Sequence, residues 1–274
     1  MSKARLDRRA LLAAMASLPL AACAHRMPGG AARSLGVATF NIWHDAGGQW
    51  LKRLELLTAA LRAADADVIA LQEILEDAGK GLSNQAETIA RALGYAVHFV
   101  APEPEGAPKR YGNAILTRLP TVEVARRKLE PLSDYRTAIR VRVQTASGPV
   151  DVVGTHLAWQ PEAAAVRSEQ LADLLAWLPA DSTPLIVMGD FNAPLDDPGL
   201  KAMGPPRFTS ALPFGAAATT LNPARGHAPR VIDHIFAETA AFTVSGVSVI
   251  GSEAVNGEYP SDHFGVAARL RRKA

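Results

Sequence analysis

The feature that most constrains the fold of this chain is residues 185–192, in which four apolar residues precede Gly189 and the polar residues Asp190 and Asn192. An apolar run of this length after a proline predicts a short strand that is buried on both faces. A carboxylate and an amide at the end of such a strand cost free energy unless the strand end opens onto a site. We therefore expect a buried strand with a polar site at its carboxyl end.

Four other apolar stretches are followed or flanked by polar side chains in the same way. These polar residues are Asn41, Glu73, His156 and an aspartate–histidine pair. Carboxylates gathered at strand ends are hard oxygen ligands that suit Mg²⁺ or Mn²⁺, and neighbouring histidines can donate to a phosphate oxygen or a leaving group. We expect these side chains to converge on one pocket that holds a divalent cation.

Helical periodicity occurs three times between the predicted strands. Residues 50–64, 85–93 and 162–178 carry apolar side chains on one face, which predicts three amphipathic helices. Gly94 follows the second of these segments and is placed to end that helix in a left-handed conformation. Each helix is expected to pack against a sheet.

The middle of the chain predicts three short strands in close succession, over residues 113–117, 122–124 and 138–143. Such an arrangement indicates an antiparallel meander. Residues 193–230 are rich in proline and glycine and are expected to be irregular. Because the sequence shows no internal repeat and no interior linker, residues 37–271 are predicted to form one domain.

The first residues of the chain read as a targeting segment. Residues 1–22 combine a basic head with an apolar run too short to span a bilayer as a lasting helix. They resemble a bacterial lipoprotein signal peptide that ends at Cys23, and Arg8 and Arg9 resemble a twin-arginine export signal. We expect export, a lipid anchor on Cys23 at the periplasmic or cell-surface face, and a flexible tether over residues 23–36. The alternative is a plain secretory peptide cleaved nearby.

The charge of the chain argues against avid, non-specific binding to nucleic acid. Residues 1–22 hold four of the 29 basic and one of the 27 acidic residues, which leaves 25 basic and 26 acidic residues in the remainder. Non-specific nucleic-acid binding rests on many phosphate contacts from lysine and arginine. Cys23 is the only cysteine in the sequence, so the domain needs no disulfide bonds.

Seven stretches of the sequence resemble motifs of the endonuclease/exonuclease/phosphatase superfamily, the DNase-I-like metal-dependent phosphoesterases, in the order in which that superfamily has them. They are residues 39–42, 71–73, 112–116, 154–157, 189–192, 232–235 and 261–264. The resemblance implies an α/β (α+β) fold, a four-layer αββα sandwich of two mixed, mainly antiparallel β-sheets flanked by helices. It also implies an active site at one end of the sheets.

The same resemblance implies roles for the polar residues. Glu73 is then the principal ligand of Mg²⁺, or of Mn²⁺ in its place, with Asn41 and Asp262 nearby. Asp190 orients or deprotonates the attacking water, and Asn192 hydrogen-bonds the phosphate as charge builds on it. The cation acts as a Lewis acid for in-line displacement.

The resemblance assigns two histidines to the reacting phosphate. His263 contacts the scissile phosphate, with its tautomer held by Asp233. His156 lies opposite, as a phosphate ligand or a general acid. In the DNase I branch a glutamate partners the second histidine, whereas residues 110–113 of this chain contain no carboxylate.

Two further residues are assigned to the substrate. Asn113 is expected to hydrogen-bond the phosphate or the metal site, and Arg136 fits a position where several branches of the superfamily place a basic residue. The other histidines are assigned to the surface or the core. These are His44, His98, His227 and His234.

The predicted activity is hydrolysis of a phosphodiester by an exported, membrane-tethered monomer. Three substrate classes stay open, namely nucleic acid, a phospholipid or sphingolipid head group, and a soluble phosphorylated metabolite. An extracellular nuclease and a sphingomyelinase-like lipid phosphodiesterase are therefore both alternatives. A binding protein that has lost the chemistry is disfavoured, because Glu73, Asp190 and His263 are all present.

Overall fold

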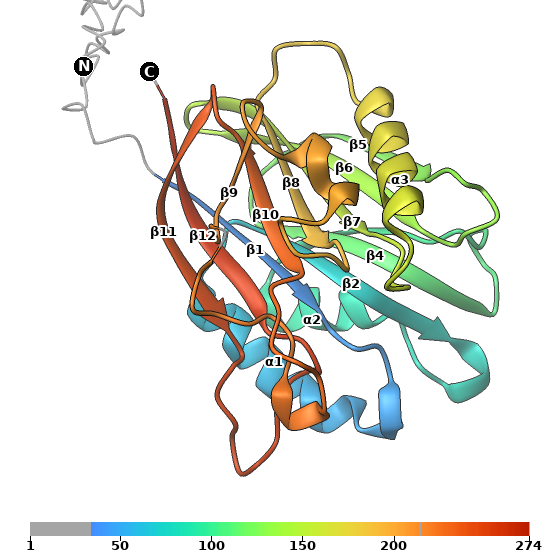
Figure 1. Ribbon diagram of the computed structural model, residues 1–274. Helices are drawn as coiled ribbons and strands as arrows, with labels where there is room; N and C mark the ends of the chain where they lie inside the picture. Colours follow the sequence, from blue (N-terminus) through green and yellow to red (C-terminus); the bar gives the residue numbers. More distant parts are fainter. Residues whose placement is uncertain (1–33, 214, 274) are drawn as a thin grey trace, which may run out of the picture. The chain divides into compact units, whose positions relative to one another are not determined.

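The computed structural model of the chain describes residues 34–213 and 215–273. Two six-stranded β-sheets pack face to face in this part of the chain, with helices on their outer faces (Figure 1). The predicted signal peptide, Cys23 and nearly all of the predicted tether lie outside the described residues. Within the described residues, no helix is long and apolar enough to cross a membrane.

The first sheet has the strand order β11-β12-β1-β2-β4-β3. Its strands are β1 (Leu35–Asn41), β2 (Val68–Asp77), β3 (Ala96–Val100), β4 (Lys109–Thr117), β11 (Phe242–Ile250) and β12 (Gly265–Arg272). Strands β1 and β2 are parallel and are joined by helix α1 (Trp50–Ala64), whereas the other neighbours in this sheet are antiparallel.

The second sheet repeats this plan with the order β5-β6-β7-β8-β10-β9. Its strands are β5 (Thr121–Lys128), β6 (Thr137–Thr145), β7 (Gly148–His156), β8 (Leu185–Asp190), β9 (Phe208–Ser210) and β10 (Asp233–Glu238). Strands β7 and β8 are parallel and are joined by helix α3 (Ala164–Trp177), and the remaining pairs are antiparallel.

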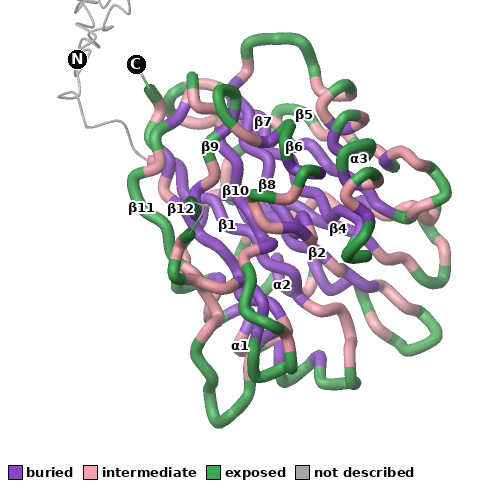
Figure 2. Tube along the Cα trace, viewed as in Figure 1, coloured by how far each residue is buried: buried purple, intermediate pink, exposed green. Residues whose placement is uncertain are grey.

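Three hydrophobic clusters hold the layers together. One cluster fills the space between the two sheets and is rich in valine and isoleucine from β6, β7 and β12. A second joins α1 and α2 (Gln85–Leu93) to the outer face of the first sheet, and a third joins α3 to the outer face of the second sheet. Figure 2 shows the central strands buried along their length. The predicted four-layer αββα sandwich is confirmed.

The short 3₁₀ helices lie in the connections. They are η1 (Ala46–Gly48), η2 (Ala78–Lys80), η3 (Pro198–Met203) and η4 (Pro223–Arg225). The three predicted α-helices are present, and Gly94 ends α2 with a φ of 78°. The segment predicted to be irregular also contains the edge strand β9, so that prediction is wrong in part.

The predicted meander is wrong in part, because only its second and third strands pair with each other. Strand β4 pairs with β2 and β3 in the first sheet, whereas β5 and β6 pair with each other in the second. The chain passes from one sheet to the other at residues 118–120, where the Arg118 side chain binds Asp65 and Asp67. Periodicity shows which side chains of a strand are buried, but it does not show which sheet the strand joins.

The two parallel pairs bring four polar residues to one end of the sandwich. In the first sheet Asn41 lies opposite Gln72, and in the second His156 lies opposite Asp190. The antiparallel neighbour β10 begins at Asp233, which also lies opposite Asp190. Polar side chains from both sheets therefore gather where β1, β7 and β8 end and β10 begins, beside the middle of β2.

Candidate active site

The backbone at the end of β8 is shaped by Gly189. A Cβ atom at this position would lie 2.0 Å from the Thr155 carbonyl oxygen on β7, and the residue has a φ of 157°. A larger residue would therefore push the two strands apart. The glycine lets β7 and β8 pair up to their last residues, His156 and Asp190.

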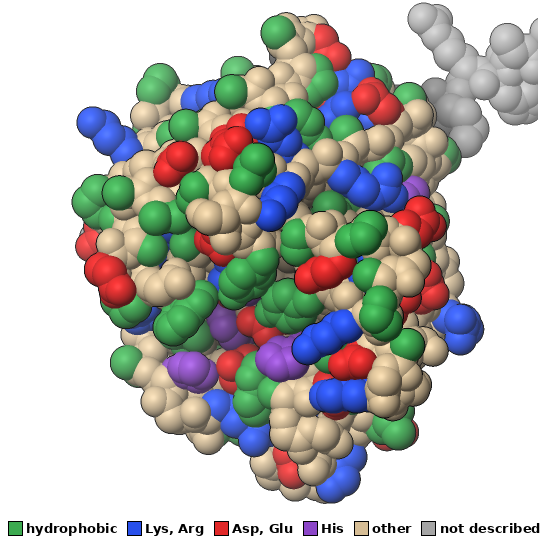
Figure 3. All heavy atoms as spheres, turned by 90° about the vertical axis from the view of Figure 1, so that its right-hand side faces the viewer, with side chains coloured by type: hydrophobic (Ala, Val, Ile, Leu, Met, Phe, Trp, Pro, Cys, Tyr) green, Lys and Arg blue, Asp and Glu red, His purple; other side chains and the backbone are tan. Residues whose placement is uncertain are grey.

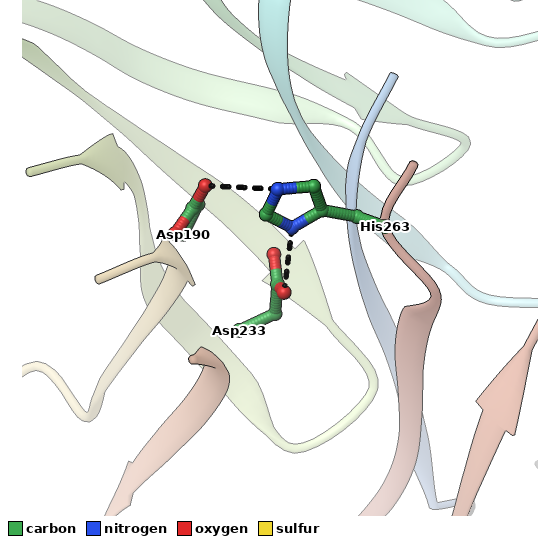
Figure 4. Close-up of side chains that lie close together, drawn as sticks. All are labelled: Asp190, Asp233 and His263. Atoms are coloured by element: carbon green, nitrogen blue, oxygen red, sulfur yellow. Dashed lines mark hydrogen bonds and ion pairs between the residues drawn. The ribbon is translucent and has the colours of Figure 1, made fainter. Parts of the chain in front are cut away.

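The buried centre of the site is a chain of Asp233, His263 and Asp190. His263 lies between the two carboxylates (Figure 4), with Nδ1 3.0 Å from Asp233 Oδ2 and Nε2 3.8 Å from Asp190 Oδ2. All three residues are buried, and their nearest ligand-type atoms lie within 4.8 Å of one another. The predicted pairing of His263 with Asp233 is present in the structure.

The charges in this centre are set by burial and by neighbouring groups. Burial would lower the pKa of His263, but the carboxylates of Asp233 and Asp190 raise it to about 10. Burial and the charge of Asp233 raise the pKa of Asp190 to about 7, against the opposing effect of His263. Near neutral pH the site thus holds an imidazolium beside a carboxylate that is poised to exchange a proton.

Asn41 connects this centre to the first sheet. Its Nδ2 donates to Asp190 Oδ2 at 2.9 Å and to Glu73 Oε1 at 3.2 Å. Its Oδ1 accepts from the backbone N–H of Trp43 at 3.0 Å, which fixes the orientation of the amide. The side chain predicted to be a metal ligand therefore bridges the two carboxylates as a donor.

Glu73 occupies an irregular part of β2. The apolar stretch that precedes Glu73 ends at residue 71, but β2 continues to Asp77, and the pairing with β4 shifts between Leu71 and Ile74. Glu73 lies in this bulge with a φ of 61°, a conformation that non-glycine residues seldom adopt. Because the bulge changes the direction of the side chain, Glu73 can face Asn41 rather than the hydrophobic core.

The carboxylate of Glu73 is held in its ionised form. Burial would raise its pKa, but hydrogen bonds from His44 and Asn41 help to lower it to about 2. His44 Nδ1 lies 2.8 Å from Glu73 Oε2. The side chain is 18% exposed, so the carboxylate is charged and reachable from solvent.

Asp262 provides a second carboxylate near Glu73. Burial raises its pKa, and the negative charge of Glu73 contributes in the same direction, against the opposing charge of His263. His227 Nε2 lies 3.4 Å from Asp262 Oδ2. A divalent cation would relieve the repulsion between these two partly exposed carboxylates. Their oxygens are the donors that Mg²⁺ and Mn²⁺ prefer.

The buried trio of Asp190, Asp233 and His263 is a poorer cation site. Its geometry places three ligand-type atoms close together. However, both ring nitrogens of His263 face carboxylates, and the pKa of about 10 makes the ring an imidazolium near neutral pH. The positive charge that the two aspartates require is therefore supplied by the protein itself.

His156 and Asn192 form the opposite wall. His156 Nε2 lies 2.9 Å from Asn192 Nδ2 and 3.3 Å from Asp190 Oδ2. Burial and the positive charge of Arg136 lower the pKa of His156 well below its usual value, so the ring is neutral near pH 7. Asn192 has a φ of 52°, and its backbone N–H donates to Asp190 Oδ1 at 2.8 Å.

A polar recess next to His156 contains the two residues assigned to the substrate. Asn113 donates to the carbonyl and hydroxyl of Thr137, both at 3.0 Å, and its buried Oδ1 has no partner in the described chain. Arg136 is 3% exposed, its guanidinium lies 4.4 Å from the ring centroid of Tyr135, and its Nε also lacks a partner there. Tyr111 and His156 line the same recess.

The structure thus brings all ten predicted site residues to one end of the sandwich, where histidine and acidic side chains gather on one face of the molecule (Figure 3). Sequence reasoning missed two of their partners. His44 and His227 were assigned to the surface or core, yet they contact Glu73 and Asp262. His98 instead contacts the Thr121 hydroxyl, and the buried His234 contacts the Ala193 carbonyl.

Comparison with known proteins identifies a family. The model of the endonuclease/exonuclease/phosphatase family matches residues 38–263 of this chain. Mouse protein angel homolog 2 is 26% identical over 161 residues, which cover 53% of this chain and 29% of that protein. The match thus spans less than a third of that relative's length.

Two solved structures share the fold. The catalytic domain of human Nocturnin, solved with a bound sulfate anion, has a TM-score of 0.71 at 23% identity, and the match covers 88% of this chain and 94% of that one. An endonuclease/exonuclease/phosphatase from Beutenbergia cavernae has a TM-score of 0.70 at 26% identity, over 88% of this chain and 72% of that one.

Proposed function

Because this chain belongs to the endonuclease/exonuclease/phosphatase family, we propose that it is a divalent-cation-dependent hydrolase of phosphodiesters. The observation that carries the proposal is His263 between Asp233 and Asp190, two buried carboxylates of which one has a pKa near 7. A carboxylate with this pKa is suited to accept a proton from water at neutral pH. The adjacent imidazolium supplies positive charge for a phosphoryl oxygen.

The polar recess supports an oxyanion as the substrate group. Arg136 offers an Nε–H that has no partner in the described chain, and Asn192 lies beside the neutral ring of His156. Preorganised donors of this kind stabilise the charge that develops in the transition state, and each is typically worth roughly 10²- to 10³-fold in rate. A neutral His156 acts here as a hydrogen-bonding ligand of the phosphate, in preference to the alternative of a cationic general acid.

The cation is proposed to bind Glu73 and Asp262, beside Asn41. Mg²⁺ fits the hard oxygen donors, and Mn²⁺ takes the same donors in its place. When bound, the cation supplies Lewis-acid stabilisation of negative charge on the phosphoryl oxygens. The protein's own side chains carry out the proton transfer and stabilise the phosphate. Asp190 accepts a proton, and Asp233 keeps His263 charged.

A nuclease is the second candidate function, and one observation favours it. Tyr111 lies between His44 and Tyr135, with ring centroids 5.9 and 6.1 Å away, so three rings line the approach to Glu73 and Arg136. Aromatic rings beside a phosphate-binding cation are suited to stack nucleobases. A lipid head group and a soluble phosphorylated metabolite remain alternative substrates of the same reaction.

The test is hydrolysis of bis(4-nitrophenyl) phosphate with and without a chelator. We expect turnover to disappear on chelation and to return with Mg²⁺ or Mn²⁺. Asp233→Asn should lower kcat by roughly 10²- to 10⁴-fold, because His263 loses the group that keeps it charged and oriented. The matched control is Asp173→Asn, which removes a carboxylate that binds Arg127 on the outer face of the second sheet and should leave turnover unchanged.

Substrate class is resolved by a panel of single-stranded DNA, RNA, sphingomyelin, phosphatidylinositol and inositol phosphates. A rate on nucleic acid well above the rate on the reporter would support the nuclease. Wild-type protein that binds the cation but turns over none of these compounds would instead indicate a binding protein of the same fold.

We also propose that the chain is exported, anchored to the membrane by a lipid on Cys23, and monomeric. The support for export and for the anchor is the resemblance of residues 1–22 to a lipoprotein signal. Mass spectrometry of the processed amino terminus should show a diacylglyceryl group on Cys23, and Cys23→Ser should release the protein from membranes. An unmodified Cys23 or cleavage elsewhere would contradict the anchor. Light scattering of the soluble chain tests the monomer.

A further inference from the structure

Among the described residues, the two most deeply buried arginine side chains lie one in each of the crossover helices. Arg53 of α1 and Arg167 of α3 are each 1% exposed. Burying a guanidinium costs free energy unless its N–H groups are satisfied, and an apolar side chain would fill similar space without that cost. The presence of one such residue at the corresponding place in each half of the fold requires a reason other than packing.

Arg53 binds backbone carbonyls from two separate segments. Nη1 donates to Ile42 at 2.6 Å and to Pro260 at 3.1 Å. Nη2 donates to Trp43 at 3.0 Å and to His44 at 2.5 Å. The guanidinium therefore joins the turn that follows β1 to the turn that precedes β12.

The first of these turns is held in an unfavourable backbone conformation. Trp43 and His44 have φ values of 57° and 23°, which non-glycine residues seldom adopt. Such a conformation persists only where surrounding interactions hold it. The carbonyls of both residues are bound by Arg53, and the turn is what places His44 within 2.8 Å of Glu73.

The second segment carries the other proposed cation ligand. Pro260 precedes Ser261 and Asp262 in the chain. The Ser261 hydroxyl donates to the Asn41 carbonyl at 2.7 Å, so this segment is tied to β1 at a second point. Arg53 therefore fixes the positions of Asn41 and Asp262 relative to each other.

Arg167 makes the corresponding contacts in the second half. It donates to the carbonyls of Ala158 at 3.2 Å and Gln160 at 2.9 Å, in the loop that follows β7 and His156. It also forms an ion pair of 2.8 Å with Asp197, in the segment that follows β8. Arg167 thus joins the two loops that follow the strands carrying His156 and Asp190.

We propose that Arg53 is a positioning residue for the cation-binding side of the site and that Arg167 is a positioning residue for the phosphate-binding side. The inference rests on the proposed function, since it assigns each arginine to one side of that site. Arginine suits both positions, because the two Nη groups of its planar fork offer four donors in fixed directions, whereas lysine offers three donors from one point. We therefore expect that lysine at either position does not hold the two segments in place.

The test separates cation binding from turnover in the full chain. Calorimetric titration with Mn²⁺ alone measures affinity without any substrate. We expect Arg53→Met and Arg53→Lys to weaken Mn²⁺ binding at least tenfold. Arg167→Met should leave Mn²⁺ affinity within twofold of wild type, while it lowers kcat on bis(4-nitrophenyl) phosphate at saturating Mn²⁺ at least tenfold.

The matched control is Arg140→Met. Arg140 is also a buried arginine, but it lies in β6 and is ion-paired with Asp151 and Glu123. This substitution should lower the thermal unfolding temperature and leave both Mn²⁺ affinity and kcat unchanged. If Arg53→Met fails to fold, the lysine variant decides the outcome.

Two results would overturn the inference. One is a folded Arg53 variant that binds Mn²⁺ as tightly as wild type. The other is that the Arg53 and Arg167 variants lose Mn²⁺ affinity and kcat to the same extent. Wild-type protein that binds no divalent cation would instead contradict the proposed function, so the two failures are distinguishable.

Discussion

The two βαβ units of this molecule, β1–α1–β2 and β7–α3–β8, are built alike but carry carboxylates of opposite character. Each unit has a pair of parallel strands, a crossover helix with a buried arginine, and polar residues at the same end of the sandwich. The first unit presents Asn41 and Glu73, and the second presents His156 and Asp190. Because the two scaffolds are alike, differences between the carboxylates of Glu73 and Asp190 can be attributed to their immediate surroundings.

The difference lies in burial and in the neighbouring groups. Glu73 is 18% exposed, and donors from Asn41 and His44 help to hold its pKa at about 2 against burial. Asp190 is 1% exposed, and burial together with Asp233 raises its pKa to about 7. One unit therefore supplies a permanent negative charge suited to a cation, and the other supplies a proton acceptor.

The largest effect is expected from Asp190→Asn, which removes the proton acceptor from the second unit. We predict that kcat falls by about 10³-fold or more, within the range lost when general-base catalysis is removed together with its charge. Mn²⁺ affinity measured by calorimetry should change little. A loss of cation binding as large as the loss of kcat would show that the two units do not have separate tasks.

The same substitution has a consequence for stability. The pKa of Asp190 is raised on folding from 3.8 to about 7, so its stabilising contribution is present at low pH and is lost as the pH rises through this window. Asparagine does not titrate. The variant should therefore gain stability relative to wild type between about pH 4 and pH 7, as measured by thermal unfolding.

The reciprocal change in the first unit is Glu73→Gln. We expect Mn²⁺ affinity to fall by roughly 100-fold, because a charged ligand is replaced by a neutral one, while a high Mn²⁺ concentration restores part of kcat. Calorimetry and the cation dependence of turnover measure these two quantities. The control is Glu76→Gln, on the same strand beyond the bulge, where the side chain contacts Arg110 and Asn84. Equal losses in both variants would contradict the assignment.

The parts of the fold that follow from the sequence are those encoded by local pattern. The apolar run of β8 ending at Asp190 and the periodicity of α1, α2 and α3 identify the elements, because burial repeats along each of them. The seven motifs contain nine of the ten residues that the structure gathers at one end of the sandwich, and Arg136 lies outside them. Each of these signals lies within a single segment, so it can be read without knowing which other segments that segment contacts.

Contacts that depend on two irregular segments could not be predicted. His44 reaches Glu73 only because the chain turns with positive φ at Trp43 and His44 and β2 bulges at Glu73. Periodicity encodes neither irregularity. Arg53 likewise reads as one charged residue of an amphipathic helix, and its burial follows from carbonyls that lie on two distant turns.

The pH dependence of the reaction tests the coupling within the second unit. We expect kcat/KM to rise as the pH passes about 7, where Asp190 loses its proton, and to fall above about 10, where His263 loses its proton. Asp233→Asn removes a negative charge that raises both pKa values. Both limbs of the residual activity should therefore move to lower pH, and limbs that stay in place would indicate other titrating groups.

The smallest effect is expected from His44→Ala, which leaves every carboxylate in place and removes one donor to Glu73. Residues that orient a metal ligand typically contribute about 10- to 100-fold in metal affinity, and we expect a value near the lower end because Asn41 still donates to the same carboxylate. His98→Ala is the matched control, since the His98 side chain is hydrogen-bonded to the Thr121 hydroxyl, away from Glu73 and Asp262. Because the hydrogen bond from His44 helps to lower the pKa of Glu73, the variant should also bind Mn²⁺ less tightly as the pH falls, and more steeply so than wild type. An affinity equal to that of the control would place His44 at the rim of the site without a part in holding the cation.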